Sequence, residues 1–170
     1  MNISLIGMMG CGKTTIGKCL SEKLNLYFVD TDSNIVEKEN CSINEIFEKK
    51  GENYFREVET KVLIETLKSD NQIISTGGGI IKKDENINLL KEKSIIFYLE
   101  ADDKTLFERV KNTKERPLLN VENMKEKITN LLREREVKYK QAHYTISTIN
   151  KTPEEISDEI IGKINEYSRS

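Results

Sequence analysis

The chain has 170 residues, of which 36% are hydrophobic and 33% are charged, and its formal net charge at pH 7 is −2. This length suits one layered core and is too short for two domains of ordinary size. The small net charge gives no support for nucleic acid or an acidic membrane as the main partner. No apolar run reaches the roughly 18 residues of a membrane span, and the first residues lead directly into a strand and a glycine-rich motif, so we expect a protein of the cytoplasm.

The N-terminal segment carries a phosphate-binding motif. Residues 7–15 read GMMGCGKTT and satisfy the pattern G-x-x-x-x-G-K-[ST]. An apolar run before them predicts a buried strand, and apolar residues at helical spacing after them predict a helix. Glycine permits a tight turn in which successive backbone N–H groups point into one anion-sized hollow at the start of that helix. A glycine-rich turn with an incidental Lys-Thr pair is the alternative, and the strand and helix on either side argue against it.

The motif also predicts how the loop contacts a nucleotide. We expect Lys13 to reach the β- and γ-phosphates and the Thr14 hydroxyl to hold Mg²⁺. The other expected nucleotide contacts in the loop are Gly10, Cys11, Gly12 and Thr15.

Two carboxylates follow the second predicted strand. Residues 26–29 (LYFV) predict this strand, and Asp30 and Asp32 come directly after it. Open parallel sheets bind ligands at the carboxyl edge, so we expect Asp30 in the outer shell of Mg²⁺ and Asp32 near an acceptor hydroxyl. The alternative is that these residues cap the following helix, which is a common use of Asp.

A long helical stretch is predicted next, over about residues 42–67, with a break near Gly51. Within it, Arg56 and Glu59 are three residues apart, so they share one helix face and can form an ion pair. Taken alone, this pair is best explained as a surface salt bridge.

The third predicted strand, Gln72–Ser75, leads into Thr76 and three consecutive glycines, Gly77, Gly78 and Gly79. Glycines in a row lose much conformational entropy on folding, so they indicate that the backbone here closely approaches another group. A substrate is the expected neighbour, and a flexible turn is the alternative.

The C-terminal half continues the alternation of strands and helices, without a linker or an internal repeat, so we expect one domain over 1–170. The single histidine, His143, is expected to be structural. The predicted elements are a buried strand over 94–99, a helix over about 102–111, a helix over about 121–141 that carries Arg133 and Arg135, a strand over 144–147 and a closing helix from Pro153.

One segment of this half is predicted to be a mobile loop. Residues 112–120 (NTKERPLLN) have no apolar periodicity and contain a proline. A kinase must exclude water from the transferring phosphoryl group, so a loop in this place suits a lid, at about 112–123, that carries Arg116 over the phosphates.

Taken together, these motifs resemble the shikimate kinase family. The resemblance covers nearly the whole chain and rests on residues 7–15, Asp30-Thr31-Asp32, Phe55-Arg56 with Glu59, Thr76–Gly79, Arg116-Pro117-Leu118-Leu119 and Arg135 with Tyr139. It implies an α/β fold like that of the nucleoside monophosphate kinases: a three-layer α/β/α P-loop fold with a five-stranded parallel sheet in the order 2-3-1-4-5, a mobile lid and a substrate-binding region at about 31–63. It also implies transfer of the γ-phosphoryl group of ATP to the 3-hydroxyl of shikimate, in the pathway to chorismate and the aromatic amino acids.

The resemblance assigns roles to residues of the substrate pocket. Shikimate has one carboxylate and three hydroxyls, so its pocket needs cations at one end and an acceptor at the other. Arg56 and Arg135 match the arginines that bind the carboxylate, with Glu59 orienting Arg56. Asp32 matches the group that contacts the ring hydroxyls and is the candidate base, and residues 77–79 are expected to lie along the ring.

On the nucleotide side, the resemblance implies ATP as co-substrate and Mg²⁺ at Thr14 and Asp30, with Asp30 acting through water. Lys13 and Arg116 would neutralise the charge that grows on the phosphoryl oxygens. Arg109 matches an arginine that packs on adenine. The adenine-side loop corresponds to residues 150–153, with Lys151 and Pro153 as contacts.

Two other hypotheses remain, one a related kinase and the other a protein of a different class. A related small-molecule kinase such as gluconate kinase shares the phosphate loop and an aspartate, but it has no need for the glycine run together with two pocket arginines. A regulatory nucleotide-binding module without catalysis would lack Lys13, Asp32 or a pocket arginine, and all are present. We expect a monomer with a small molecule as partner, and neither nucleic acid nor membrane, because no heptad seam or obvious apolar patch is present.

Overall fold

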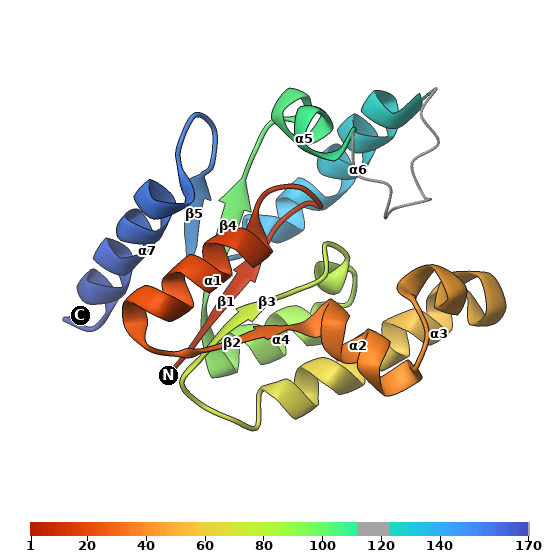
Figure 1. Ribbon diagram of the computed structural model, residues 1–170, viewed down its shortest axis with the longest axis horizontal. Helices are drawn as coiled ribbons and strands as arrows, with labels where there is room; N and C mark the ends of the chain where they lie inside the picture. The colour runs from red at the N-terminus through yellow and green to blue at the C-terminus, as the bar shows by residue number, and fades with distance from the viewer. Residues whose placement is uncertain (112–122, 170) are drawn as a thin grey trace.

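The chain folds around a five-stranded sheet with the strand order β2-β3-β1-β4-β5 (Figure 1). The computed structural model describes residues 1–111 and 123–169. All neighbouring strands in this sheet run parallel, so the predicted sheet type and order are confirmed. The strands are β1 (Asn2–Ile6), β2 (Tyr27–Asp30), β3 (Gln72–Ser75), β4 (Ser94–Glu100) and β5 (Tyr144–Ser147).

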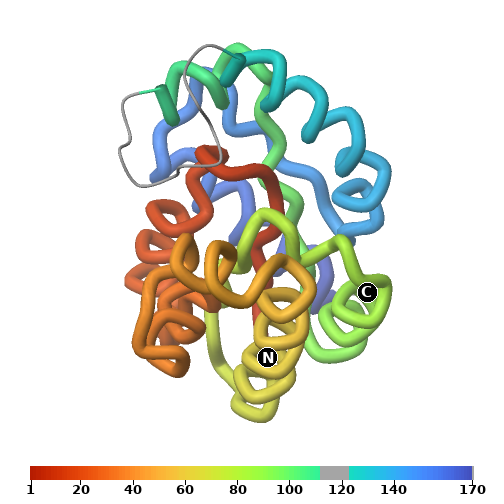
Figure 2. The backbone as a smooth tube through the Cα atoms, turned by 90° about the vertical axis from the view of Figure 1, so that its right-hand side faces the viewer, coloured from red at the N-terminus to blue at the C-terminus, as the bar shows by residue number. Residues whose placement is uncertain are grey.

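Helices cover both faces of the sheet and thereby form the expected three layers. They are α1 (Lys13–Leu24), α2 (Thr31–Glu39), α3 (Ile43–Thr66), the short 3₁₀ helix η1 (Ile80–Lys82), α4 (Asp84–Lys93), α5 (Asp103–Val110), α6 (Met124–Tyr139) and α7 (Pro153–Tyr167). α1 packs against α7 and β3, whereas α4 packs against β4, and Figure 2 shows α1 and α4 on opposite sides of the strands. Within the described ranges, none of these helices is long and apolar enough to cross a membrane.

Burial of the central strands explains their sequences. β1 and β3 are buried along their whole length, and β4 is buried except at its two ends. Because helices cover both faces, these strands are largely continuous apolar runs and do not alternate between polar and apolar residues. The register pairs Leu5 of β1 with Ser75 of β3 and with Phe97 of β4. The segments that follow β1, β2 and β3 therefore leave the sheet at the same edge.

α3 is interrupted where the sequence predicts a break. Gly51 has φ 82° and ψ 171°, which lies outside the helical region. The helix begins with a capping box, in which the Ser42 side chain accepts a hydrogen bond from the Glu45 backbone N–H and the Glu45 carboxylate accepts one from the Ser42 backbone N–H. The longer segment, after Gly51, carries Arg56 and Glu59.

The structure differs from the sequence prediction between β3 and β4. The sequence analysis assigns no element to residues 80–93, because the apolar face of α4 contains only Ile87 and Leu90, too few for a clear helical period. Packing of α4 against β4 stabilises a helix that propensity alone leaves marginal. The predicted lid at 112–123, with Arg116, lies outside the described residues except for Asn123.

His143 has a structural role, as predicted. Its Nδ1 accepts a hydrogen bond from the backbone N–H of Ile96 in β4 at 2.9 Å. Burial lowers the pKa of His143, which favours the neutral imidazole that this acceptor role requires.

Candidate active site

The phosphate-binding loop connects β1 to α1 and has the backbone geometry that its glycines predict. Gly10 and Gly12 have φ 80° and 100°, in the left-handed region that side chains other than glycine rarely adopt. Gly12 is the N-cap residue of α1, and no side chain caps this helix. The first N–H groups of α1 are therefore available to an anion, and the helix dipole favours negative charge at the same place.

Lys13 lies inside the hollow of this loop. Its ammonium donates hydrogen bonds to the carbonyl oxygens of Gly7 at 2.8 Å and of Met8 at 3.0 Å. The Cys11 sulfur lies 3.7 Å from the same nitrogen. Buried in this way, Lys13 places one positive charge where the motif predicts the phosphates of a nucleotide.

Asp30 caps α2, which is the alternative that the sequence left open, and it also contacts Thr14. As N-cap of α2, its Oδ1 accepts hydrogen bonds from the backbone N–H groups of Asp32 at 3.0 Å and Ser33 at 3.2 Å. Its second oxygen, Oδ2, accepts a hydrogen bond from the Thr14 hydroxyl at 3.0 Å. The two predicted Mg²⁺ residues are thus adjacent, and the capping hydrogen bonds fix the carboxylate that faces Thr14.

Thr14 and Asp30 suit a Mg²⁺ ion that binds together with a nucleotide. Mg²⁺ commonly takes one or two protein oxygens and completes its octahedron with water and substrate phosphates. Among the described residues, no group of three or more His, Cys, Asp or Glu side chains is arranged to hold a metal ion. A site that uses Thr14 and Asp30 therefore needs the phosphates of a nucleotide to complete it.

A pocket of about 320 Å³ next to the loop brings together the predicted substrate residues. Its polar wall consists of these predicted residues, Asp32, Arg56, Glu59, Gly77, Gly78, Gly79 and Arg135, together with Ser42 and Asn44, which the motifs did not identify. Its apolar wall, which the motifs did not identify as a whole, consists of Met9, Val36, Ile43, Phe47 and Phe55. The Phe47 and Phe55 rings pack at a centroid distance of 4.7 Å across the Gly51 break of α3. The shape and chemistry of such a pocket suit a small ring with polar groups on one side.

The Arg56–Glu59 pair is buried and is not the surface salt bridge that the spacing alone suggests. Arg56 Nη1 donates to Glu59 Oε2 at 2.8 Å, and the Glu59 side chain is only 1% exposed. Burial raises the pKa of Glu59, and the guanidinium of Arg56 opposes that change. Glu59 Oε1 has no hydrogen-bond partner in the described part of the chain. A carboxylate this deeply buried orients its arginine firmly.

The three glycines after β3 provide space for the side chains of the pocket. A Cβ atom on Gly77 would lie 2.6 Å from Asp32 Oδ1 and 2.9 Å from Glu59 Oε1. A Cβ atom on Gly79 would lie 2.6 Å from Arg56 Cζ. None of the three has a φ in the left-handed region. At Gly77 and Gly79, acidic and basic groups of the protein itself leave no room for a side chain, whereas the sequence pattern suggested a substrate as the close neighbour.

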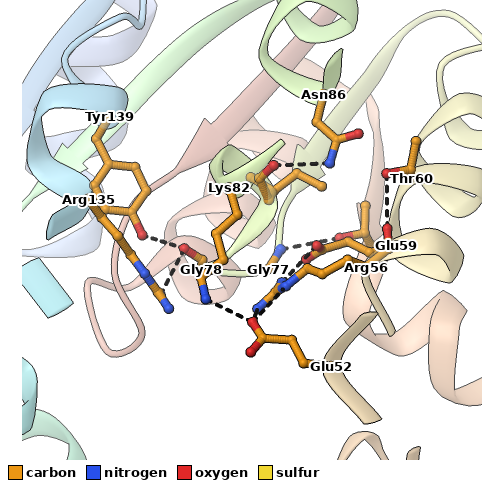
Figure 3. A network of polar contacts seen from close by, with 12 residues as sticks. Glu52, Arg56, Glu59, Thr60, Gly77, Gly78, Lys82, Asn86, Arg135 and Tyr139 are labelled. Carbon is orange, nitrogen blue, oxygen red and sulfur yellow. Dashed lines mark hydrogen bonds and ion pairs between the residues drawn. The ribbon is translucent and has the colours of Figure 1, made fainter. Parts of the chain in front are cut away.

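Arg135 and Tyr139 fix the backbone at Gly78 from the other side. They lie four residues apart on α6, and both donate a hydrogen bond to the Gly78 carbonyl oxygen, Arg135 through Nη1 at 3.2 Å (Figure 3). The Tyr139 ring stacks on Tyr98 of β4 at a centroid distance of 5.0 Å. Arg135 is buried, and its Nε has no hydrogen-bond partner among the described residues. The sequence motif includes Tyr139, but its contact with the Gly78 carbonyl becomes clear only in the structure.

A second pocket, of about 430 Å³, borders the other side of the phosphate-binding loop. It brings the predicted Arg109, Lys151 and Pro153 together with Gly10, Cys11, Gly12 and Thr15. Arg109 donates to the Thr148 hydroxyl at 3.1 Å and to the Thr148 carbonyl at 3.0 Å. The sequence did not point to Thr148, which is buried and whose hydroxyl donates to the Glu100 carbonyl at 3.1 Å. These contacts hold Arg109 between β5 and the loop.

Comparison with known proteins identifies relatives over the full chain. The family model described as "Shikimate kinase" matches residues 9–165. The chain is 44% identical to the shikimate kinase of Thermodesulfovibrio yellowstonii, over 99% of this chain and 95% of that protein. It is 45% identical to the shikimate kinase of Persephonella marina, over 96% of this chain and 98% of that protein.

The solved structures give the same result. The shikimate kinase from Acinetobacter baumannii in complex with shikimate matches with a TM-score of 0.94 and 40% identity, over 98% of this chain and 93% of that chain. A deoxyadenosine kinase from M. mycoides with bound dATP matches with a TM-score of 0.64 and 18% identity, over 97% of this chain and 100% of that chain. At this identity, the second likeness shows the shared fold alone.

Proposed function

This chain belongs to the shikimate kinase family, and from that premise we propose that it transfers the γ-phosphoryl group of ATP to the 3-hydroxyl of shikimate. It is an ATP-dependent kinase, and its substrate is a small molecule. One observation carries the proposal: a single pocket beside the phosphate-binding loop has two arginines, Arg56 and Arg135, together with the carboxylate of Asp32. A ligand with one carboxylate and several hydroxyls has the complementary chemistry.

The two arginines bind the substrate carboxylate in this proposal. Glu59 holds Nη1 of Arg56, so the remaining N–H groups of that guanidinium keep a fixed direction. Arg135 comes from the opposite side of the pocket, and its Nη1 is held by Gly78. A carboxylate between them accepts charge-assisted hydrogen bonds from two guanidinium groups, and this fixes the orientation of the ring.

Asp32 is the proposed base for the acceptor hydroxyl. It lies in the first turn of α2, and its carboxylate packs against the position of Gly77, inside the pocket. As the hydroxyl oxygen forms its bond to the γ-phosphorus, its proton passes to Asp32 and the bond between the γ-phosphorus and the bridging oxygen of ADP breaks.

The phosphate-binding loop supplies positive charge for the phosphoryl group. Lys13 exchanges its hydrogen bonds with Gly7 and Met8 for the oxygens of the β- and γ-phosphates. Thr14, together with Asp30 acting through water, would hold Mg²⁺, which would offset the negative charge of the phosphates. Arg116 serves the same purpose from the lid. Fixed positive charge of this kind is the largest contribution in this class of reaction.

The proposal also covers the adenine site, the location of the protein and its partners. The adenine base of ATP occupies the pocket that Arg109 borders, with Lys151 and Pro153 at its edge. A cytoplasmic location, a monomeric state and the absence of nucleic acid and membrane partners stay predictions.

The test is a coupled assay of ADP release with Mg·ATP and three conditions: shikimate, gluconate and no acceptor. We expect ADP release only with shikimate, and we expect Asp32→Asn to lower kcat by about 100-fold or more, since a positioned base contributes that much. ADP release with gluconate alone would assign the chain to a related kinase. ADP release that does not depend on an acceptor would contradict the proposed transfer.

A further inference from the structure

Arg56 has a second carboxylate partner whose position differs from that of Glu59. Arg56 Nε and Nη2 both donate to Glu52 Oε1, each at 3.3 Å, whereas the contact with Glu59 is 2.8 Å long. Glu52 lies four residues before Arg56 on α3, and its side chain is 48% exposed, against 1% for Glu59. Figure 3 shows Glu52 and Glu59 on either side of the Arg56 guanidinium. One partner is fixed by burial, and the other is held loosely at the surface.

Glu52 also forms an ion pair with a second cation. Lys82, at the end of η1, donates from Nζ to the same Oε1 atom at 2.8 Å, which is shorter than either contact with Arg56 (Figure 3). The ammonium of Lys82, more than the guanidinium of Arg56, lowers the pKa of Glu52. The Glu52 carboxylate can therefore leave Arg56 and still keep a counter-charge.

Glu52 and Glu59 together occupy three of the five N–H groups of Arg56 and leave two for a ligand. Arg56 donates Nη1 to Glu59, and Glu52 takes Nε and one N–H of Nη2, so both flanks of the guanidinium face carboxylates. A substrate carboxylate at Arg56 would be a third negative group around one cation, next to the negative charge of Glu52. Of the two carboxylates already present, only the exposed one is able to move away without unfolding its surroundings.

We propose that Glu52 is an exchangeable counter-anion of Arg56, which occupies the guanidinium in the free enzyme and withdraws to Lys82 when the substrate carboxylate binds. This inference rests on the proposed function, because it takes shikimate to bind through Arg56. Glu52 is thus a specificity-determining residue that competes with the substrate carboxylate, and Lys82 sets the strength of the competition.

The proposal predicts opposite effects for the two partners. Glu52→Gln removes the competing charge, so shikimate should bind more tightly, by about two- to fivefold, the range expected for one partly exposed ion pair. Lys82→Met leaves Arg56 as the remaining cation of Glu52, so shikimate should bind more weakly by a similar factor. In the double variant, Lys82→Met should have no further effect on binding, because the carboxylate it releases is no longer there.

The experiment is isothermal titration calorimetry of shikimate with the full chain and these variants. Glu57→Gln is the matched control: Glu57 is an exposed glutamate on the same helix, and the described residues offer it no hydrogen-bond or ion-pair partner. The methyl ester of shikimate is the control ligand. Because it carries no carboxylate charge, its affinity should be the same for wild type and Glu52→Gln.

The outcomes separate this inference from the proposed function. Tighter binding of shikimate by Glu52→Gln, with no change for the ester or for Glu57→Gln, supports the inference. If wild type binds and phosphorylates shikimate while Glu52→Gln binds it equally or more weakly, the inference is overturned and the proposed function stands. If wild type does not bind shikimate, both are overturned.

Discussion

Gly79 and Arg56 are packed so closely that the glycine has no room for a side chain. A Cβ atom at position 79 would lie 2.6 Å from the Cζ atom of Arg56, closer than real Cβ contacts. Glu59 holds the same guanidinium from α3, and the Gly79 backbone follows β3 and Gly78. The arginine therefore lies between a buried carboxylate and a backbone without a side chain, and these two neighbours set its direction.

This contact predicts the effect of Gly79→Ala. The added methyl group must displace Arg56 or the backbone after β3, so we expect the KM for shikimate to rise by about tenfold or more, as for the loss of one charged hydrogen bond. The KM for ATP should stay the same. The measurement is steady-state kinetics with each substrate varied in turn. Gly162→Ala is the control: a Cβ atom at this exposed helical position meets no atom within 4 Å, so kinetics should be unchanged. An unchanged KM for shikimate in Gly79→Ala would show that Arg56 does not depend on this contact.

Removal of the Tyr139 hydroxyl should also disturb the substrate pocket. Tyr139→Phe keeps the ring stacked on Tyr98 but removes the hydrogen bond to the Gly78 carbonyl, which then depends on Arg135. We expect a loss of about 1 kcal/mol in the free energy of unfolding, the usual value of one hydrogen bond, and a KM for shikimate raised severalfold. Urea denaturation and steady-state kinetics measure the two quantities. Tyr98→Phe serves as the control, since the Tyr98 hydroxyl makes no hydrogen bond with the described residues; equal effects of the two changes would argue against a role for the Tyr139 hydroxyl.

The pKa of Glu59 predicts how stability depends on pH. Burial raises this pKa above its ordinary value of 4.5, so the folded protein binds the proton more readily than the unfolded chain. The contribution of Glu59 to the free energy of unfolding is therefore largest below that ordinary value and declines as the pH rises through the raised pKa. Relative to Glu59→Gln, wild type should lose stability as the pH rises from 4.5 through the raised pKa of Glu59.

Urea denaturation of both proteins at several pH values measures this difference. Glu57→Gln, on an exposed position of the same helix, should show a difference from wild type that stays constant with pH. A difference between wild type and Glu59→Gln that grows in favour of wild type as the pH rises would mean that Arg56 outweighs burial and that the pKa of Glu59 is lowered.

A substitution at Thr148 should affect the binding of the nucleotide and not that of shikimate. Thr148→Val removes the hydroxyl that accepts from Arg109 and donates to the Glu100 carbonyl, with little change in volume. We expect the KM for ATP to rise severalfold, because Arg109 loses one of the contacts that direct it, while the KM for shikimate stays the same. The control is Thr145→Val, at an exposed position of β5, the strand that precedes Thr148. A change in the KM for shikimate alone would place Arg109 outside the nucleotide site.

Much of the fold follows from local sequence patterns. The predicted strands 72–75 and 144–147 match β3 and β5 residue for residue, because each is a short apolar or β-branched run bounded by polar or turn-forming residues. The helix α4 was missed, since its stability comes from packing against β4 and not from a helical period of its own. The predicted break of α3 at Gly51 is confirmed by its dihedral angles.

The candidate site was predictable where its residues follow the strands directly. Asp30 ends β2 opposite Ser75 of β3, and Asp32 meets Gly77 just beyond, because parallel strands end at the same edge of the sheet. Contacts between distant segments could not be predicted in the same way. Tyr139 and Gly78 are 61 residues apart, and Lys82 and Glu52 are 30 residues apart. No local period or motif encodes such a pair, so these contacts become visible only in the folded chain.

The most direct test of the central claim, that Arg56 and Arg135 recognise the carboxylate of shikimate, is phosphoryl transfer by wild type and Arg135→Ala with shikimate and with its methyl ester. Product is followed by phosphorus NMR. We expect Arg135→Ala to lower kcat/KM for shikimate by about 100-fold, as for a lost charged hydrogen bond, and wild type and variant to phosphorylate the ester equally slowly. Equal turnover of shikimate by both proteins, or an ester that wild type phosphorylates as well as shikimate, would contradict the central claim.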